Sequence, residues 1–451
     1  MLAFINGIGI GPHRLMAQYS EISSEEACDL LPISDKSALD RSSKDLEERD
    51  GAYLLSGPQC ATVIFKFCVG AGWFSLPSAF QYSGVLVGVV WIFMCGALTT
   101  YGMQRLVQTS WEVARRNGTE SAYFGDIGEA CGRLFSERCG LILRWMVNII
   151  ISITALGLAC PLVLFLADIW KQAFEEQNIV QLDISIWILI VLILIFPSIF
   201  VRKPVFLAWF SVVANTSLFL TVVAVFVNIF RTTSDWKVDN TVKWSKLPLT
   251  FGITLYAFEI APFILSVENK TKKPKQLPLV INVVMLGVSF MYAVLGSFGY
   301  ISCFPDCQDS IVLNLPDLWY YSVAKILLGF ATLCGLVFVS FIVYDAIEPI
   351  LEALVPENRF YVVALLFRML VITFSAAISA CVPQLGNVIS FCGSFVAISA
   401  GFLLPAATHT LLLYKQLSRF TIAANIIFSF CGIFILIAGV YTSVSEIISD
   451  Y

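Results

Sequence analysis

Long apolar segments recur along the chain and leave little choice of fold. After residue 58 we count about eleven segments of roughly 20 mostly apolar residues, the length that crosses a bilayer as a helix. Hydrophobic residues make up 58% of the 451 positions and charged residues 13%, against roughly 25% charged in soluble domains. Because backbone groups in lipid must be hydrogen-bonded within the chain, the sequence predicts an all-α polytopic membrane protein with eleven transmembrane helices. The expected spans are 59–81, 84–108, 141–168, 184–201, 205–230, 247–267, 278–301, 319–345, 360–380, 384–411 and 420–447.

Basic residues indicate how these spans are oriented. They concentrate in alternate loops, with Arg115 and Arg116 in one and the lysines of 270–275 in another. The side richer in Lys and Arg faces the cytosol. We therefore expect a cytosolic N-terminus and, with an odd number of spans, Tyr451 on the other side. Residues 1–58 are polar and rich in Ser, Glu and Asp, a composition typical of a disordered cytosolic tail.

Two short patterns in this tail resemble sorting signals. Tyr19 and Ile22 frame a Tyr-x-x-apolar pattern, and Glu26, Leu30 and Leu31 fit an acidic dileucine pattern. Adaptor proteins read such patterns in cytosolic tails. We therefore expect adaptor proteins as partners and an endolysosomal or vacuolar membrane as the location, with the plasma membrane as the alternative.

Two expected spans are broken where a membrane helix should continue. In the first span Gly70 and Gly72 flank Ala71; Gly is a poor helix former. In the sixth span Glu259 precedes Pro262 by three residues, and Pro removes a backbone donor. In lipid such a break survives only where it faces protein, water or a ligand. The alternative is that Gly and Pro merely kink these helices, since both are common in membrane spans.

The ordinal positions of the breaks predict an inverted repeat. Transporters built from two inverted repeats carry broken helices at matching positions, with substrate bound between them. Spans 1–5 (59–230) form the first repeat in this interpretation, spans 6–10 (247–412) form the second, and span 11 (420–447) is an addition.

The partial charges at the helix ends indicate a ligand that carries one negative and one positive group. N–H groups that start a half-helix carry positive partial charge and suit a carboxylate, while carbonyls that end the preceding half suit an ammonium. A small zwitterion fits both ends. The expected substrate-binding residues are Phe67, Val69, Gly70, Ala71, Gly72, Tyr256, Ala257 and Phe258.

Glu259 is the ionisable residue that most needs an explanation. A charge at the bilayer centre costs about 2.5–3.5 kcal/mol on insertion scales. Protonation, a substrate amine or Lys66 would each remove this cost, and a carboxyl that exchanges between such states suits proton coupling. The alternative is a structural cap on the N–H groups of the second half-helix. Lys66 is expected to extend to the interface, and the sequence suggests no partner for Lys325 or Arg368.

Several classes of function find no support in the composition. His13 and His409 are the two histidines of the chain, so a His-rich metal site is excluded and no cofactor is expected. The net charge of −4 and the lack of a basic patch with aromatics argue against a nucleic-acid partner. We do not expect an enzyme, because no His-based site and no GxGD aspartyl motif occurs in a span.

Cys303 and Cys307 share a loop. A disulfide between them and two free thiols are both compatible with the sequence.

Four stretches carry a family resemblance. KFCVGAGWFSLPSAFQYSG (66–84), YFGDIGEACG (123–132), LYAFEIAPFILSVENKTKKPKQLP (255–278) and SIVLNLPDLWYYSVAK (310–325) resemble, in order, motifs of the amino acid/auxin permease family, particularly its proton-coupled amino acid transporter branch. The resemblance implies a LeuT-type 5+5 inverted repeat plus one extra helix, and transport of amino acids with protons.

The chain departs from that branch beside the breaks. Val63 stands where the branch has a His, Cys68 where relatives often carry Asn or Ser, and Ala261 and Pro262 interrupt a stretch usually written G-I-G. Sodium coupling is less favoured than proton coupling, because a Cys is a poor ligand for a hard cation.

Two functions follow as hypotheses. The first is secondary active transport of small neutral amino acids by alternating access, with spans 3 and 8 lining the pocket and Glu259 coupling protons. The second is an amino-acid-sensing membrane receptor that signals through its N-terminal tail, which is long enough to hold a peptide signal.

Overall fold

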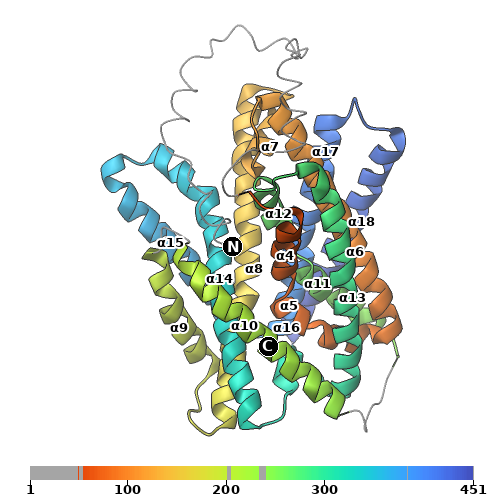
Figure 1. The fold of residues 1–451 in the computed structure, drawn as a ribbon, viewed down its shortest axis with the longest axis vertical. Coiled ribbons are helices and arrows are strands. Elements are labelled where there is room, and N and C mark those ends of the chain that lie inside the picture. Colours follow the sequence, from red (N-terminus) through yellow and green to blue (C-terminus); the bar gives the residue numbers. More distant parts are fainter. Residues whose placement is uncertain (1–48, 50–53, 201–204, 233–239, 383, 450–451) are drawn as a thin grey trace.

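The computed structural model describes Arg49 and residues 54–200, 205–232, 240–382 and 384–449, and this part of the chain is helical without a β-strand (Figure 1). Nine of its helical segments are long and apolar enough to cross a membrane, and Ile184–Phe200 is a shorter apolar helix. The all-α membrane architecture is therefore confirmed. The count of eleven spans stays a prediction.

Eight long helices of the described part of the chain lie along the expected spans. They are α6 (Leu76–Asn117), α8 (Glu137–Glu176), α9 (Ile184–Ile195, extended by a 3-10 turn to Phe200), α10 (Val205–Arg231), α13 (Leu277–Cys303), α14 (Trp319–Leu354), α15 (Glu357–Cys381) and α18 (Arg419–Ser449). A short helix, α7 (Phe124–Arg133), lies outside the spans and packs on α8.

The first expected span is divided among three helices. α4 (Gly57–Cys68) is followed by α5 (Ala71–Phe74) and by the first turns of α6. Gly84 then interrupts α6 with φ 68° and ψ 171°, a backbone conformation that Gly adopts most readily. A Cβ there would also lie 3.1 Å from the Asn240 carbonyl oxygen. Gly84 therefore marks the boundary between the first and second expected spans.

The sixth expected span is divided at the position that the sequence predicts. α11 (Leu247–Ala257) and α12 (Ala261–Glu268) are separated by three residues. Along the most apolar stretch of Trp244–Glu268, 89% of the residues are buried, against 22% along α18. The second broken helix therefore lies at the centre of the bundle, between the flank of α6 and α13 and the flank of α8 and α14 (Figure 1).

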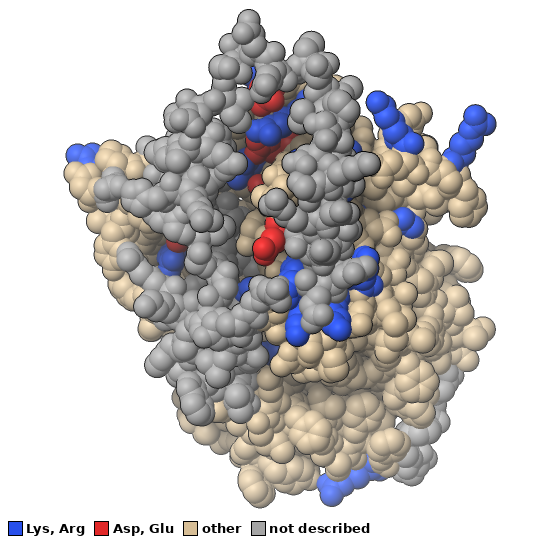
Figure 2. Space-filling model, turned by 45° about the horizontal axis from the view of Figure 1, so that its top comes forward, with Lys and Arg blue, Asp and Glu red and all other residues tan. Residues whose placement is uncertain are grey.

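Charged side chains avoid the flank of the bundle. Figure 2 shows both signs of charge on the end that carries α7, whereas the flank below is mostly uncharged. Along α18 large apolar side chains point outward, with Phe420 83%, Phe434 71% and Tyr441 74% exposed. This pattern suits helices that face lipid.

Arg49 and residues 54–58, which belong to the expected tail, take part in the packed structure. Arg49 is buried, and α4 begins at Gly57 with a capping box between Ser56 and Gln59. Such a box satisfies N–H groups that the helix start leaves free. The sorting patterns in residues 1–48 lie outside the described residues.

The two buried cations that had no predicted partner are both paired. The Lys325 ammonium, with a fully buried side chain, lies 2.6 Å from Glu176 of α8. The Arg368 guanidinium donates to both carboxylate oxygens of Glu348, at 2.5 and 2.9 Å, and to the Ile199 carbonyl. These pairs remove the cost of isolated charges and fasten α14 to α8 and to α15.

A disulfide joins Cys303 to Cys307. The structure thereby decides between the two alternatives that the sequence left open. The bridge lies where α13 passes into the loop 304–318, and this loop carries Asp309.

The Lys325–Glu176 pair predicts a stability effect. Lys325→Met leaves the largely buried Glu176 carboxylate unpaired and should lower the free energy of unfolding by about 3–5 kcal/mol. Lys325→Met with Glu176→Gln should recover part of the loss. Thermal unfolding of the purified protein measures both, with the exposed Lys415→Met as control; equal stabilities of Lys325→Met and wild type would contradict the assignment.

Candidate functional site

The first break consists of an extended linker between two half-helices. α4 ends at Cys68, Val69 and Gly70 adopt extended conformations, and α5 begins at Ala71. The first N–H groups of a helix have no partner within it. A Cβ built on Gly70 meets nothing within 4 Å, so the linker has open space beside it.

The proline at the second break stands at the position where it destabilises a helix least. Phe258, Glu259 and Ile260 separate α11 from α12, and Pro262 lies in the first turn of α12. A helix tolerates Pro there, because the missing N–H would have had no intrahelical partner. Pro262 therefore starts the second half-helix rather than kinking a continuous one.

The two breaks touch each other. A Cβ on Gly72 would lie 2.6 Å from the Cα of Ala257, so this close approach requires a glycine. Gly72 thus has a packing role between the half-helices. Of the predicted substrate-binding residues, the structure brings Gly72 and Ala257 into contact. Phe258 packs against Tyr292, a residue of α13 that contacts both breaks.

Tyr292 of α13 joins the breaks, and sequence reasoning missed it. Its hydroxyl lies within hydrogen-bonding distance of the carbonyl oxygens of Cys68 and Ala257, the latter at 2.7 Å. One hydroxyl proton satisfies only one of these carbonyls at a time. The Tyr292 ring also packs against Phe258, with centroids 4.7 Å apart. The signal in the sequence was a phenol inside a span, since a buried tyrosine hydroxyl needs a partner.

Glu259 is buried and has no ion pair among the described residues. Its side chain is 7% exposed, and Oε1 has no hydrogen-bond partner there. α12 has no side-chain cap, so the structural alternative of a Glu259 cap is not observed. Lys66 instead lies over the Phe338 ring of α14, 5.4 Å from its centroid. Of the states considered from the sequence, pairing with Lys66 is therefore not observed.

Two π-helical turns lie beside Glu259. They span Gly393–Ala397 and Ser399–Leu403 and separate α16 (Leu385–Cys392) from α17 (Leu404–Leu413). Glu259 Oε2 is 3.6 Å from the position of a Cβ on Gly401. Such turns occur frequently at functional sites, and only the nearby glycines hint at them in the sequence.

Aromatic rings enclose the breaks. Phe67 of α4 stacks on Phe263 of α12 with centroids 4.0 Å apart. The Tyr256 hydroxyl donates to the Leu158 carbonyl of α8 at 3.1 Å, so this predicted residue faces the third expected span.

A strap from the N-terminal segment covers the α7 end of both broken helices. We use the term for Arg49 and Leu55. Arg49 donates to the Glu268 carboxylate at 2.8 Å and to its carbonyl at 2.6 Å, and Trp111 donates to the same carboxylate at 2.8 Å. Leu55 exchanges backbone hydrogen bonds with the loop after α12. The strap therefore ties the start of α4 to the end of α12.

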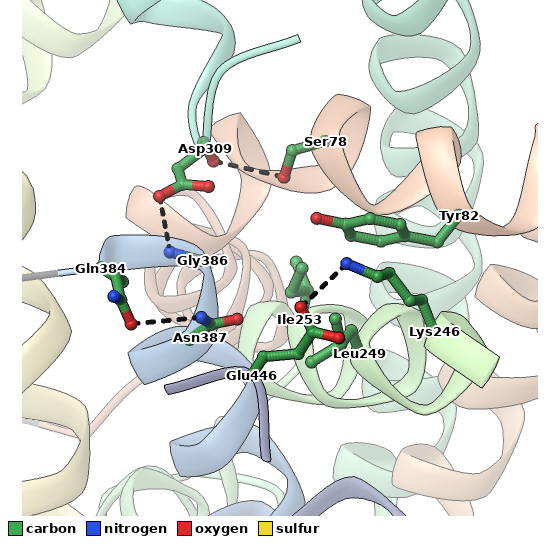
Figure 3. Close-up of a pocket in the computed structure, with 10 residues that line it drawn as sticks. All are labelled: Ser78, Tyr82, Lys246, Leu249, Ile253, Asp309, Gln384, Gly386, Asn387 and Glu446. Carbon is green, nitrogen blue, oxygen red and sulfur yellow. Dashed lines mark hydrogen bonds and ion pairs between the residues drawn. The ribbon is translucent and has the colours of Figure 1, made fainter. Parts of the chain in front are cut away.

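A polar cavity of about 270 Å³, the outer pocket, is lined in part by residues of α6 and α11 (Figure 3), whereas the strap bonds to α12 and the loop after it. It is lined by Ser78, Tyr82, Lys246, Leu249, Ile253, Asp309, Gln384, Gly386, Asn387 and Glu446. Lys246 and Glu446 form an ion pair at 2.8 Å, and Asp309 accepts a hydrogen bond of 2.9 Å from the Gly386 amide. Burial raises the pKa of the Asp309 carboxyl, and the Gly386 hydrogen bond opposes this shift.

The described residues contain no group of three or more His, Cys, Asp or Glu side chains that could hold a metal ion. The sorting-motif residues lie outside the described part of the chain, so their role stays a prediction.

Comparison with known proteins places these features in a family. Residues 55–445 match the family model described as "Transmembrane amino acid transporter protein". The "Proton-coupled amino acid transporter-like protein pathetic" of Drosophila melanogaster is 23% identical over 414 residues, which cover 89% of this chain and 88% of that protein. "Amino acid transporter AVT3A" of Arabidopsis thaliana is 26% identical over 407 residues, which cover 88% of this chain and 91% of that protein.

Two solved structures are similar at lower identity. A Na⁺-coupled sialic acid symporter in a substrate-bound outward-open state is 11% identical, with a TM-score of 0.46 and coverage of 90% of this chain and 96% of that chain. A manganese transporter of Eremococcus coleocola is 12% identical, with a TM-score of 0.46 and coverage of 85% and 94%.

The family match confirms the resemblance to the amino acid/auxin permease family and agrees with the expectation that the chain is a transporter and not an enzyme. Both breaks, Tyr292 and Glu259 lie within the matched residues. The chain belongs to the family of transmembrane amino acid transporter proteins.

Proposed function

We propose that this protein is a secondary active transporter that moves small neutral amino acids together with protons. The observation that carries the proposal is the contact between two broken helices beside a buried carboxyl, Glu259, that has no partner among the described residues. The ends of the half-helices then present N–H and C=O groups with partial charges to the substrate. Glu259 supplies a group that can exchange a proton.

The carboxylate of the substrate binds at the first break. The half-helix that starts at Ala71 continues through α6 to Ser83, and its first N–H groups carry positive partial charge. Open space beside Gly70 lets a carboxylate approach these groups.

The ammonium group binds at the carbonyls that end α4 and α11. Tyr292 has one proton for the carbonyls of Cys68 and Ala257, so one of the two always keeps an acceptor for an ammonium. The Phe67–Phe263 stack crowds the space around this point, which supports a small apolar substrate side chain.

Glu259 is the proposed proton-coupling residue. A lone carboxyl in a membrane interior favours its protonated form, because ionisation there is costly. Sodium is less favoured, since the sulfur of Cys68 is a poor ligand for a hard cation. The name of the Drosophila relative, which specifies proton coupling, supports the same choice.

The proposed architecture has eleven spans, with inverted repeats at 59–230 and 247–412 and a further span at 420–447. The α7 end faces the cytosol, and the strap closes the cytosolic ends of the broken helices. Release of substrate on that side then requires α4 and α12 to separate, which is alternating access. The proposed location is an endolysosomal or vacuolar membrane, with adaptor proteins reading the tail.

One observation favours a second candidate function, amino-acid sensing. The strap connects the N-terminal segment directly to the end of α12. A movement of the second broken helix would therefore also displace this segment. Binding of amino acid without flux, together with loss of a partner on deletion of residues 1–48, would favour a receptor over a transporter.

Replacing Glu259 tests proton coupling. Glu259→Gln keeps the shape of the side chain but removes its exchangeable proton. One coupled proton gives about tenfold accumulation per pH unit, and this accumulation in proteoliposomes should fall to the level without a gradient. Exchange without a gradient should persist. The exposed Glu137→Gln, at 68% side-chain exposure, serves as control. Full gradient-driven accumulation by Glu259→Gln would show that another group couples the proton.

A disulfide between α4 and the loop after α12, beside the strap, tests the cytosolic closure. Cys60 Sγ lies 3.4 Å from Thr271 Oγ1, so Thr271→Cys places two thiols in contact. Oxidation should link the start of α4 to the loop after α12 and reduce flux at least tenfold, and reduction should restore it. Thr271→Ser under oxidation is the matched control. Undiminished flux through protein that mass spectrometry shows to be fully linked would rule out the proposed movement.

A further inference from the structure

The outer pocket lies on the two broken helices but is separate from the breaks. Ser78 follows Gly72 by six residues, and Ile253 precedes Ala257 by four. At 1.5 Å per residue, these positions are roughly 6–9 Å along the helices from the breaks. Thr250 of α11 donates to the Ala79 carbonyl of α6 at 2.9 Å, which holds the two half-helices together at the level of the pocket.

The cavity is large enough for a small molecule, and more carboxyl groups than ammonium groups line it. Its volume of about 270 Å³ far exceeds the roughly 10–15 Å³ that one water molecule needs. Two carboxylates, Asp309 and Glu446, line it together with one ammonium, that of Lys246. Lys246 and Glu446 pair with each other, so Asp309 is the carboxyl group of this lining that has no ion pair among the described residues.

Asp309 has one oxygen in use and one available. Oδ2 accepts from the Gly386 amide, whereas no hydrogen bond to Oδ1 is found among the described residues. Figure 3 shows this second oxygen on the side of the carboxyl that faces Ser78 and Tyr82 across the cavity. A carboxylate oxygen in this position suits an ammonium donor, which forms strong charge-assisted hydrogen bonds.

We infer that the outer pocket is a second binding site, in which Asp309 holds the ammonium group of an amino acid before the molecule reaches the broken helices. The apolar side chains of Leu249 and Ile253, which line the same cavity, receive the aliphatic part of the ligand. The inference rests on the proposed transport function and adds a site on the non-cytosolic side to it.

The alternative role for Asp309 is purely structural. Its carboxylate accepts a hydrogen bond at the start of α16, as a capping residue does. Asp309→Asn separates the roles, because the Asn side-chain oxygen still accepts from Gly386 while the negative charge is lost. The exposed Asp317→Asn, in the same loop, removes a charge away from the pocket and is the matched control.

Uptake of L-alanine by oriented proteoliposomes is the test. For Asp309→Asn we expect the KM from the non-cytosolic side to rise roughly tenfold, the loss of one charge-assisted hydrogen bond. The KM from the cytosolic side, kcat and thermal stability should match wild type, and Asp317→Asn should match it throughout. Unchanged KM values from both sides, or equal rises from both, would overturn the inference. Failure of wild type to transport would instead reject the proposed function.

A second variant covers the case in which Asp309→Asn does not fold. Asn387→Cys places a thiol in the pocket, in a background where the exposed Cys381 and Cys431 are Ser. Both L-alanine and ethylamine, which lacks the carboxylate, should slow its reaction with a membrane-impermeant thiol reagent at least threefold. Propionate, which lacks the amine, should not. Equal reaction rates with and without ethylamine would overturn the inference.

Discussion

Backbone groups freed by a helix break within a membrane need partners, and this requirement organises the centre of the protein. The breaks after Cys68 and Ala257 expose carbonyls in a region without bulk water. Tyr292 provides one hydroxyl for both of them, and Gly72 lets the half-helices approach. Incomplete satisfaction by a single proton leaves an acceptor for a ligand. The proposed site for a charged molecule therefore depends on how the breaks are stabilised.

The treatment of ionisable groups separates structure from proposed function. Lys325 and Arg368 are buried in well-formed ion pairs, as expected where a lone charge would be costly. Glu259 is as deeply buried but has no such partner. Because Glu259 stays unpaired while these other buried charges are paired, it is the group that we propose to change its protonation during a transport cycle. The backbone beside Glu259 is also irregular, because the π-helical turns between α16 and α17 lie there.

Much of the fold and part of the site were predictable from the sequence, because the signals are local. Apolar runs of membrane length located the helices, and the glycines around Ala71 and the Glu259–Pro262 pair located both breaks. Contacts between distant segments were not predictable. The Tyr292 hydroxyl meets a carbonyl 224 residues away, and the Arg49 partner is 219 residues distant. A polar composition likewise suggested disorder up to residue 58, although the end of that segment is ordered by its contacts with α12.

Binding of the amino acid where the two broken helices touch is the proposal on which the transport mechanism depends. It can be measured by equilibrium binding of radiolabelled L-alanine to purified Gly72→Ala, with Gly287→Ala, where a Cβ meets nothing within 4 Å, as the comparison. A methyl group on Gly72 forces the half-helices apart, so we expect loss of binding for this variant and wild-type binding for Gly287→Ala, both as folded, monodisperse protein. Wild-type affinity in Gly72→Ala would show that the amino acid binds elsewhere.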